Sequence, residues 1–268
     1  MFRYFSFLFS LILLTTPLQA QHGFFSNIGR DVKHFAGTGL DLAVAPLSYD
    51  SEDWMYVGGV VATTTLLFTV DREVRRYAQG LDKNELDDYF FIDSYMGNQY
   101  SLFLGAGIYG YGLLAGNNRV RHTGLMAMEA FVYSGAITGV FKVLFSRRRP
   151  FAGDSQLYFR PVNWLDNTYH SLPSGHTAVS FAVSTVLADA VDSGLWKVFW
   201  YGTAAWVGAA RIYHNQHWFS DVFLGGVIGY ATGRFIVNRD KRQAFSRLKM
   251  QPWFGRYASG VQLSWQLD

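Results

Sequence analysis

The chain of 268 residues has no cysteine, only six prolines, and charged side chains at only 16% of its positions. Without cysteine it can form neither a disulfide nor a thiolate metal site, and mechanisms with a cysteine nucleophile are excluded. The net charge of +3 is small, so no nucleic-acid partner is expected. The sequence shows no internal repeat that would divide it into similar units.

Apolar runs long enough to cross a membrane are scarce as well. A transmembrane helix needs about 20 mainly apolar residues, whereas the mean hydropathy here is only +0.06 and charges interrupt the apolar stretches. Aromatic residues nevertheless make up 18% of the chain, and a basic run, residues 234–249, follows the last apolar stretch, as it does beside membrane helices. Membrane association is therefore expected, and an integral membrane protein and a soluble periplasmic protein both stay open.

The first twenty residues have the features of a secretory signal. Arg3 precedes a short apolar core, residues 5–14, and Ala20 supplies a small residue at a cleavage position. We therefore expect a signal peptide over residues 1–20 and an exported chain, in the periplasm or the cell-envelope membrane. A signal anchor that stays attached is the alternative.

Six apolar stretches, rich in Ala, Gly and Leu and free of proline, indicate helices. Pro150 ends the third stretch, because proline cannot continue a helix, and residues 82–97 indicate a weaker helix. The pattern predicts an all-α fold, a bundle of about six helices with the functional site at one end. The stretches are residues 55–70, 101–115, 124–145, 175–191, 195–210 and 219–237.

The tail of the chain follows a different pattern. Val261, Leu263, Trp265 and Leu267 alternate with polar residues, which is typical of a half-buried strand. We expect a short C-terminal β-hairpin in which residues 247–254 supply the second strand. The expected divisions are a signal peptide (1–20), an N-terminal amphipathic extension (21–54), a helical domain (55–240) and a C-terminal tail (241–268).

Three motifs between residues 142 and 221 supply three cations, two histidines and a carboxylate. This set suits the binding of a phosphoryl group and the breaking of its ester bond. Lys142 and Arg149 are seven residues apart, or two helical turns, which predicts that both project from one helix face. Taken singly, Lys142 would be a helix-end lysine and Arg149 part of a solvated basic run. The motifs are Lys142-x6-Arg149-Pro150, Pro173-Ser174-Gly175-His176 and Arg211-x5-His217-x3-Asp221.

The second motif opens a helix. The first N–H groups of a helix have no partner within it, and the helix dipole favours an anion there. Gly175 lets the backbone approach a ligand closely, and Ser174 can add a hydroxyl. His176 would sit at the positive end of the dipole, which indicates a function, although an ordinary capped helix start is the alternative.

The third motif pairs a histidine with a carboxylate. His217 and Asp221 are four residues apart and face each other on a helix. A carboxylate on one ring N–H fixes the tautomer and leaves the other nitrogen free to attack. A surface pair or a pair of metal ligands are the alternatives, but no further ligand cluster is evident. His170 and His214 lie in the same loops. A packing role is expected for His214, and tuning of the nucleophile is the alternative.

In this order and spacing the motifs resemble those of the phosphatidic acid phosphatase type 2 / vanadium haloperoxidase superfamily, KxxxxxxRP, PSGH and SRxxxxxHxxxD. Ala210 stands where the family has Ser, which puts only a minor phosphate contact in doubt. The likeness extends over residues 55–237. It implies a phosphohistidine on His217, with His176 as general acid, and no metal or cofactor. The implied phosphate-binding residues are Lys142, Arg149, Ser174, Gly175 and Arg211.

The sequence thus predicts a metal-independent phosphatase for phosphomonoesters or diphosphates, with a lipid substrate because the chain is hydrophobic and exported. A soluble acid phosphatase, a vanadate-dependent haloperoxidase and a non-catalytic envelope protein are the alternatives.

Membrane members of the family work with the motif loops on the outer side. If the signal is removed and six helices cross, loops 146–172 and 211–218 would face the cytoplasm, so one helix does not cross or the protein is periplasmic. In either case the active site is expected to face away from the cytoplasm. The oligomeric state is left open.

Overall fold

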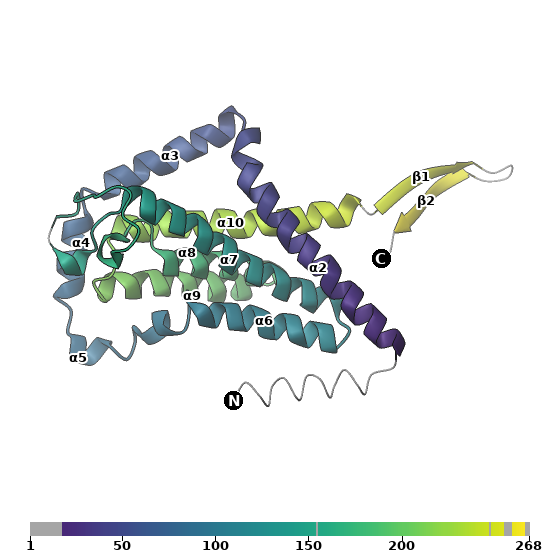
Figure 1. Cartoon of the computed structure of the whole chain (residues 1–268), viewed down its shortest axis with the longest axis horizontal. Helices are drawn as coiled ribbons and strands as arrows, with labels where there is room; N and C mark the ends of the chain where they lie inside the picture. Colours follow the sequence, from purple (N-terminus) through teal and green to yellow (C-terminus); the bar gives the residue numbers. More distant parts are fainter. Residues whose placement is uncertain (1–17, 154, 247, 255–258, 266–268) are drawn as a thin grey trace.

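The computed structural model describes residues 18–153, 155–246, 248–254 and 259–265. The predicted all-α fold is confirmed, with helices α6 to α10 forming the bundle (Figure 1). Most of the expected signal peptide, residues 1–17, lies outside the described residues. The helices are α2 (Leu18–Val44), α3 (Ser51–Leu67), α4 (Asp71–Gln79), α5 (Lys83–Leu86), α6 (Gln99–Leu114), α7 (Asn118–Phe145), α8 (Gly175–Ala190), α9 (Gly194–Tyr213) and α10 (Phe219–Ser246).

Helix α8 lies at the centre of the bundle and packs against α7, α9 and α10. Its sequence, mostly Ala, Val, Ser and Thr, has small side chains that let neighbouring helices approach, and most of its residues are buried. Val183 and Val186 join Ala127 and Ala130 of α7 and Ile236 of α10 in the apolar core. The core therefore runs along the length of α8 and leaves the end at Gly175 for the polar motifs.

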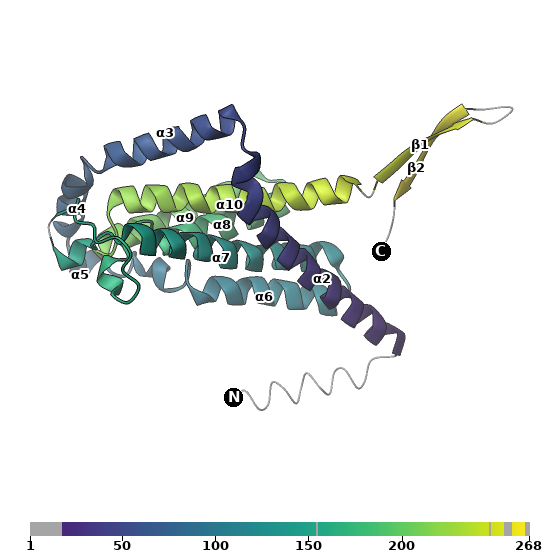
Figure 2. The same ribbon diagram turned by 45° about the horizontal axis from the view of Figure 1, so that its top comes forward.

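A buried polar network fastens α2 across the bundle (Figures 1 and 2). Glu129 of α7 is fully buried and accepts a hydrogen bond from Thr38 at 3.1 Å, with His34 Nδ1 at 2.8 Å from the same oxygen. Arg239 of α10 donates to Thr38 at 2.9 Å and to Asp41 at 2.7 Å. Three helices thus meet through polar side chains, because a buried carboxylate must find hydrogen-bond partners.

Helix α3 stands beside the bundle and exposes apolar side chains. Trp54, Met55 and Tyr56 are each more than half exposed, and successive helix residues lie about 100° apart, so these side chains point in different directions. Only Thr64 of this helix is buried. An apolar, exposed surface of this kind marks a site of membrane or partner contact.

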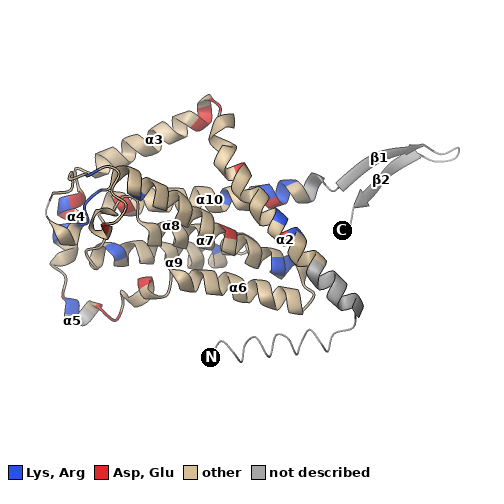
Figure 3. Ribbon diagram, viewed as in Figure 1, with Lys and Arg blue, Asp and Glu red and all other residues tan. Residues whose placement is uncertain are grey.

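By length and composition, α7 is the described helix that could cross a membrane. Helices α3 and α4, bent by 55° at the break between them, pass the same test as one broken segment. Figure 3 shows charged residues gathered near the two ends of the bundle, while the length of α6 and much of α8 and α9 are uncharged.

Residues 82–97 depart from the expected single helix. They form α5 and a 3-10 turn, Phe91–Ser94. Gly97, which follows them, has φ +81°, and a Cβ there would lie 2.4 Å from the carbonyl oxygen of His176. Asp71, which directly follows the first apolar stretch, begins α4. In the tail, β1 (Leu248–Phe254) and β2 (Ser259–Trp265) pair antiparallel, with Met250 opposite Leu263.

Because α8 and α10 pack closely, one methyl group added between them should lower the free energy of unfolding strongly. A Cβ on Gly229 would lie 2.1 Å from the carbonyl oxygen of Ala178, so Gly229→Ala should lower the free energy of unfolding by about 2–3 kcal/mol through overpacking. Gly107 of α6 faces open space, and Gly107→Ala should raise that free energy by about 0.5–1 kcal/mol. Urea unfolding of both variants in the same detergent measures the contrast. Equal effects would contradict the packing.

Candidate active site

The three motifs meet at one end of the bundle. The end of α7, the loop after it, the start of α8 and the turn between α9 and α10 each supply a part. Burial lowers the pKa of His217 well below its usual value, and the nearby charges of Arg149, Lys142 and Arg211 lower it further. Lys142 Nζ lies 3.4 Å from the position that a Cβ on Gly175 would occupy. The structure therefore places the predicted cations around His217.

Lys142 and Arg149 do not project from one helix face, so that prediction is wrong. Helix α7 ends at Phe145, Ser146 adopts a left-handed conformation with φ 42°, and Arg149 is extended with φ −70° and ψ 151°. A residue before proline is disfavoured in a helix, and Arg149 precedes Pro150. The loop, and not helical periodicity, brings the two cations together.

The guanidinium of Arg149 is held by neutral acceptors. It is only 6% exposed, its Nε and Nη2 donate to the backbone and side-chain oxygens of Asn167 at 3.0 Å, and Nη1 donates to Gln216 at 2.9 Å. Burial and the charge of Arg211 lower its pKa to about 10. Within the described residues no carboxylate pairs with Arg149, so its charge is available to an anionic ligand.

Arg211 is oriented by a carboxylate that the motifs do not contain. Its Nη1 donates to Asp93 at 2.8 Å, and His214 Nδ1 lies 2.9 Å from the same oxygen. The buried Nε of Arg211 has no hydrogen-bond partner among the described residues. A buried donor without a partner is costly, and a phosphate oxygen would satisfy it.

The start of α8 is a capped helix end. Ser174 Oγ accepts a hydrogen bond from Thr177 Oγ1 at 2.8 Å and lies 3.4 Å from its backbone N–H. The hydroxyl of Ser174 is thus used as a cap, and its contact with phosphate stays a prediction. Burial and the charges of Arg211 and Lys142 lower the pKa of His176 to about 3, so without a bound anion this imidazole is neutral.

The ring of His217 is oriented by a backbone carbonyl. Its Nδ1 lies 2.8 Å from the carbonyl oxygen of Ser171, which can only accept, so we assign the proton to Nδ1 and the lone pair to Nε2. Asp221 Oδ2 is 3.8 Å from Nδ1, too far for a hydrogen bond. The predicted direct orientation by Asp221 is therefore replaced by an indirect one.

Asp221 instead holds the segments that carry His217. It is fully buried and accepts from the Ser171 hydroxyl, from the backbone N–H of Trp218 at 2.8 Å and from Arg147 at 2.6 Å. Arg147, also fully buried, donates its other Nη to Asp71 at 2.6 Å. The Ser171 carbonyl contacts the ring of His217, and Trp218 follows His217 in the chain, so this carboxylate sets the position of the ring through the backbone.

Sequence reasoning missed Arg147, Asp71, Asp93 and Ser171. Arg147 belongs to a run of three arginines that indicates solvent exposure, and the two aspartates lie more than 110 residues from the side chains of α9 and α10 that they contact. His170 Nε2 lies 2.8 Å from the carbonyl oxygen of Asn163, a structural contact. In the described ranges no three His, Cys, Asp or Glu side chains are grouped for a metal, and a metal-free reaction stays a prediction.

The buried pair of Arg147 and Asp221 predicts that its disruption costs stability. Asp221→Asn should lower the free energy of unfolding by about 3–5 kcal/mol, because it leaves a buried arginine short of one countercharge. Asp192→Asn removes an exposed partner of Lys197 and should cost under about 1 kcal/mol. Denaturant unfolding followed by circular dichroism compares the two variants. An Asp221→Asn variant as stable as Asp192→Asn would contradict the assigned network.

Comparison with known proteins places the motifs in a family. The model of the PAP2 superfamily matches residues 123–244. A lipid A 1-phosphatase of Porphyromonas gingivalis is 40% identical over 76 residues, which cover 28% of this chain and 16% of that protein. The chain thus matches a small part of that relative's length.

Two solved structures share the fold. The crystal structure of Aquifex aeolicus LpxE is 24% identical, with a TM-score of 0.50 over 63% of this chain and 95% of that one. A transmembrane PAP2 type phosphatidylglycerolphosphate phosphatase from Bacillus subtilis is 18% identical, with a TM-score of 0.52 over 69% of this chain and 95% of that one. Residues 123–244, which carry all three motifs, therefore belong to the PAP2 superfamily.

Proposed function

We propose that this protein is a metal-independent phosphatase that removes phosphate from a phosphorylated lipid through a phosphohistidine on His217. One observation carries the proposal: a buried imidazole with its Nδ1 held by a carbonyl lies among three cations. A neutral Nε2 is a nucleophile, and cations around it neutralise the phosphate oxygens that would otherwise repel it.

In the first step His217 Nε2 attacks phosphorus while Lys142, Arg149 and Arg211 bind the non-bridging oxygens. The bond between phosphorus and the leaving oxygen breaks, and His176 transfers a proton to that oxygen. The imidazolium formed at His217 keeps its Nδ1 proton on the Ser171 carbonyl. In the second step water attacks phosphorus, His176 accepts its proton, and the bond to Nε2 breaks to release phosphate.

The proton on His176 comes with the substrate. Without a bound anion, burial and the nearby cations lower its pKa to about 3, so it cannot serve as an acid before a phosphate binds. A bound phosphate dianion compensates the positive charges and raises the affinity of the imidazole for a proton. A phosphate monoanion that binds neutral His176 brings this proton itself, and the same protonation state results.

The similar proteins support a lipid substrate. Lipid A 1-phosphatase acts on a lipid by its name, and the Bacillus subtilis structure is named a phosphatidylglycerolphosphate phosphatase. The exposed apolar side chains of α3 and the length of α7 fit association with a membrane. We propose that the protein lies in the cell-envelope membrane with its site facing away from the cytoplasm, as the signal-like residues 1–20 indicate.

Removal of the nucleophile tests this proposal. His217→Ala should abolish release of phosphate from phosphatidic acid in detergent micelles, and acid quenching of wild type with ³²P-labelled substrate should trap a phosphoenzyme that the variant lacks. His170→Ala changes a histidine of the neighbouring loop whose Nε2 lies 2.8 Å from the carbonyl oxygen of Asn163. This variant is the matched control and should keep the label. Label retained in His217→Ala would assign the nucleophile to another residue. Turnover of soluble phosphates alone would indicate a soluble acid phosphatase.

The lowered histidine pKa values predict the pH profile of kcat/KM. Burial and the nearby cations lower the pKa of His217 well below the ordinary value of 6.5, so no acidic limb centred near that value should appear. Above about pH 6, the second pKa of a phosphate ester, kcat/KM should fall tenfold per unit because the monoanion that brings the proton is lost. A substrate with a more acidic phosphate should shift the limb to lower pH. A kcat/KM that rises from pH 6 to 9 would contradict this proton source.

A further inference from the structure

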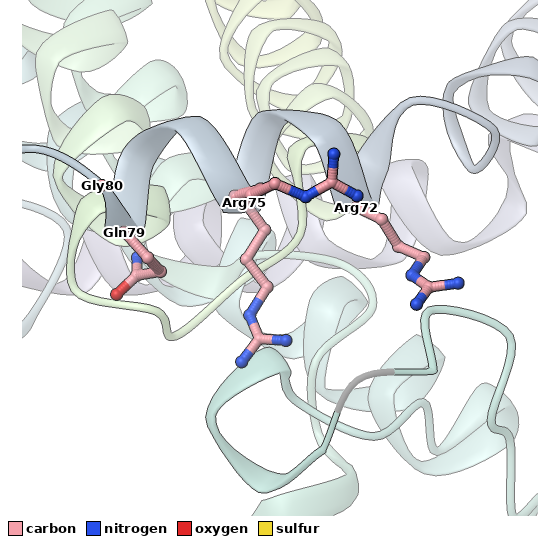
Figure 4. A pocket seen from close by; sticks show the side chains of 5 residues that line it. Arg72, Arg75, Gln79 and Gly80 are labelled. Atoms are coloured by element: carbon pink, nitrogen blue, oxygen red, sulfur yellow. The ribbon is translucent and has the colours of Figure 1, made fainter.

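Helix α4 carries an arginine-rich face that the catalytic cradle does not use. Four of its long polar side chains share one side of the helix, because they are spaced three or four residues apart or are adjacent in that spacing. They are Arg72, Arg75, Arg76 and Gln79. They line a cavity of about 460 Å³ together with Gly80, and Arg72 and Arg75 extend from the helix toward the loop after α7 (Figure 4). The size is within the range of ligand pockets.

The charge of this pocket is positive and only partly compensated. Arg76 pairs with Glu73 at 2.6 Å, but both side chains are about two-thirds exposed, so the pair is weak. Asp71 of the same helix faces away, toward Arg147. Arg72 forms no hydrogen bond or ion pair with any residue in the described ranges. With Arg72 lacking a countercharge in the described ranges and Arg76 only weakly paired with Glu73, the pocket keeps positive charge.

The pocket adjoins the catalytic turn without being part of it. Arg75 Nε donates to Asn215 at 2.8 Å, and Gln79 Nε2 donates to the Tyr213 carbonyl at 3.0 Å. The guanidinium of Arg75 also lies 5.6 Å from the ring of Trp218, which is buried. These contacts lie between Arg211 and Trp218 in the chain. The residues that line the pocket are distinct from the cradle residues Lys142, Arg149 and Arg211.

We propose that this pocket is a second anion site that binds a phosphate group of a lipid headgroup while the first phosphate occupies the cradle; the assignment rests on the proposed function. Arginine forks bind phosphate oxygens in pairs, and the volume exceeds that of a phosphate, so part of the attached sugar or glycerol fits as well. The second phosphate belongs either to the substrate itself or to a neighbouring membrane lipid.

The test compares two double variants. Arg72→Gln/Arg76→Gln is the pocket variant, and Arg119→Gln/Lys197→Gln is the control variant. The first variant leaves Arg75 and its contact to Asn215 intact, and the second removes two cations from the starts of α7 and α9, at the opposite end of the bundle. The substrates are phosphatidic acid and a glycolipid with two phosphate monoesters, each in neutral micelles with and without phosphatidylglycerol, whose headgroup is a phosphodiester.

If the substrate supplies the second phosphate, the pocket variant should raise KM for the bisphosphorylated lipid by about tenfold and leave that for phosphatidic acid unchanged. If a neighbouring lipid supplies it, phosphatidylglycerol should lower KM for both substrates in wild type and not in the pocket variant. KM values equal to those of the control variant under all conditions would overturn the proposal.

Binding measured without turnover separates this proposal from the proposed function. Short-chain phosphatidylglycerol is titrated into each detergent-solubilised protein. It should bind wild type and the control variant with equal affinity, and it should bind the pocket variant about tenfold more weakly. If wild type releases no phosphate from any lipid yet shows this difference, the anion site stands and the phosphatase proposal fails. Equal binding by all three proteins would overturn the site.

Discussion

The bridge that Arg147 makes between Asp71 and Asp221 determines the geometry of the site. All three side chains are fully buried, and removing such charges from water costs several kcal/mol per ion. The bridge fixes three segments relative to one another: the start of α4, the loop after α7 and the first turn of α10. Since Asp221 also holds Ser171, whose carbonyl binds His217, the orientation of the imidazole depends on the bridge.

The site keeps its structural charges and its functional charges apart. Arg147 is neutralised by two carboxylates, and Asp93 orients Arg211 from one side. Arg149, by contrast, is held by amide and carbonyl oxygens. The cluster therefore carries net positive charge, and burial together with this charge lowers the pKa values of both histidines. A phosphate supplies the missing negative charge, so binding and the protonation of His176 are linked.

The parts of this arrangement that could be predicted from the sequence are local ones. Apolar stretches located the bundle helices, and the motif residues around His217 were found from their types and spacing. The convergence of Lys142 and Arg149 was predicted for the wrong reason, because the residue before Pro150 leaves the helix. Asp71 and Asp93 could not be predicted, since nothing near them in the sequence shows that they will meet Arg147 and Arg211. Such pairings arise from the packing of segments that are distant in the chain.

The central claim is that Lys142, Arg149 and Arg211 form a cradle for a phosphoryl group in line with His217 Nε2. Vanadate adopts the five-coordinate geometry of the transition state, so a structure of the protein with vanadate, prepared in the presence of a chelator, tests it most directly. The account predicts vanadium bonded to His217 Nε2, with its equatorial oxygens on the three cations and an apical oxygen beside His176. Vanadate bound away from His217, or bound only when a divalent metal is restored, would contradict it.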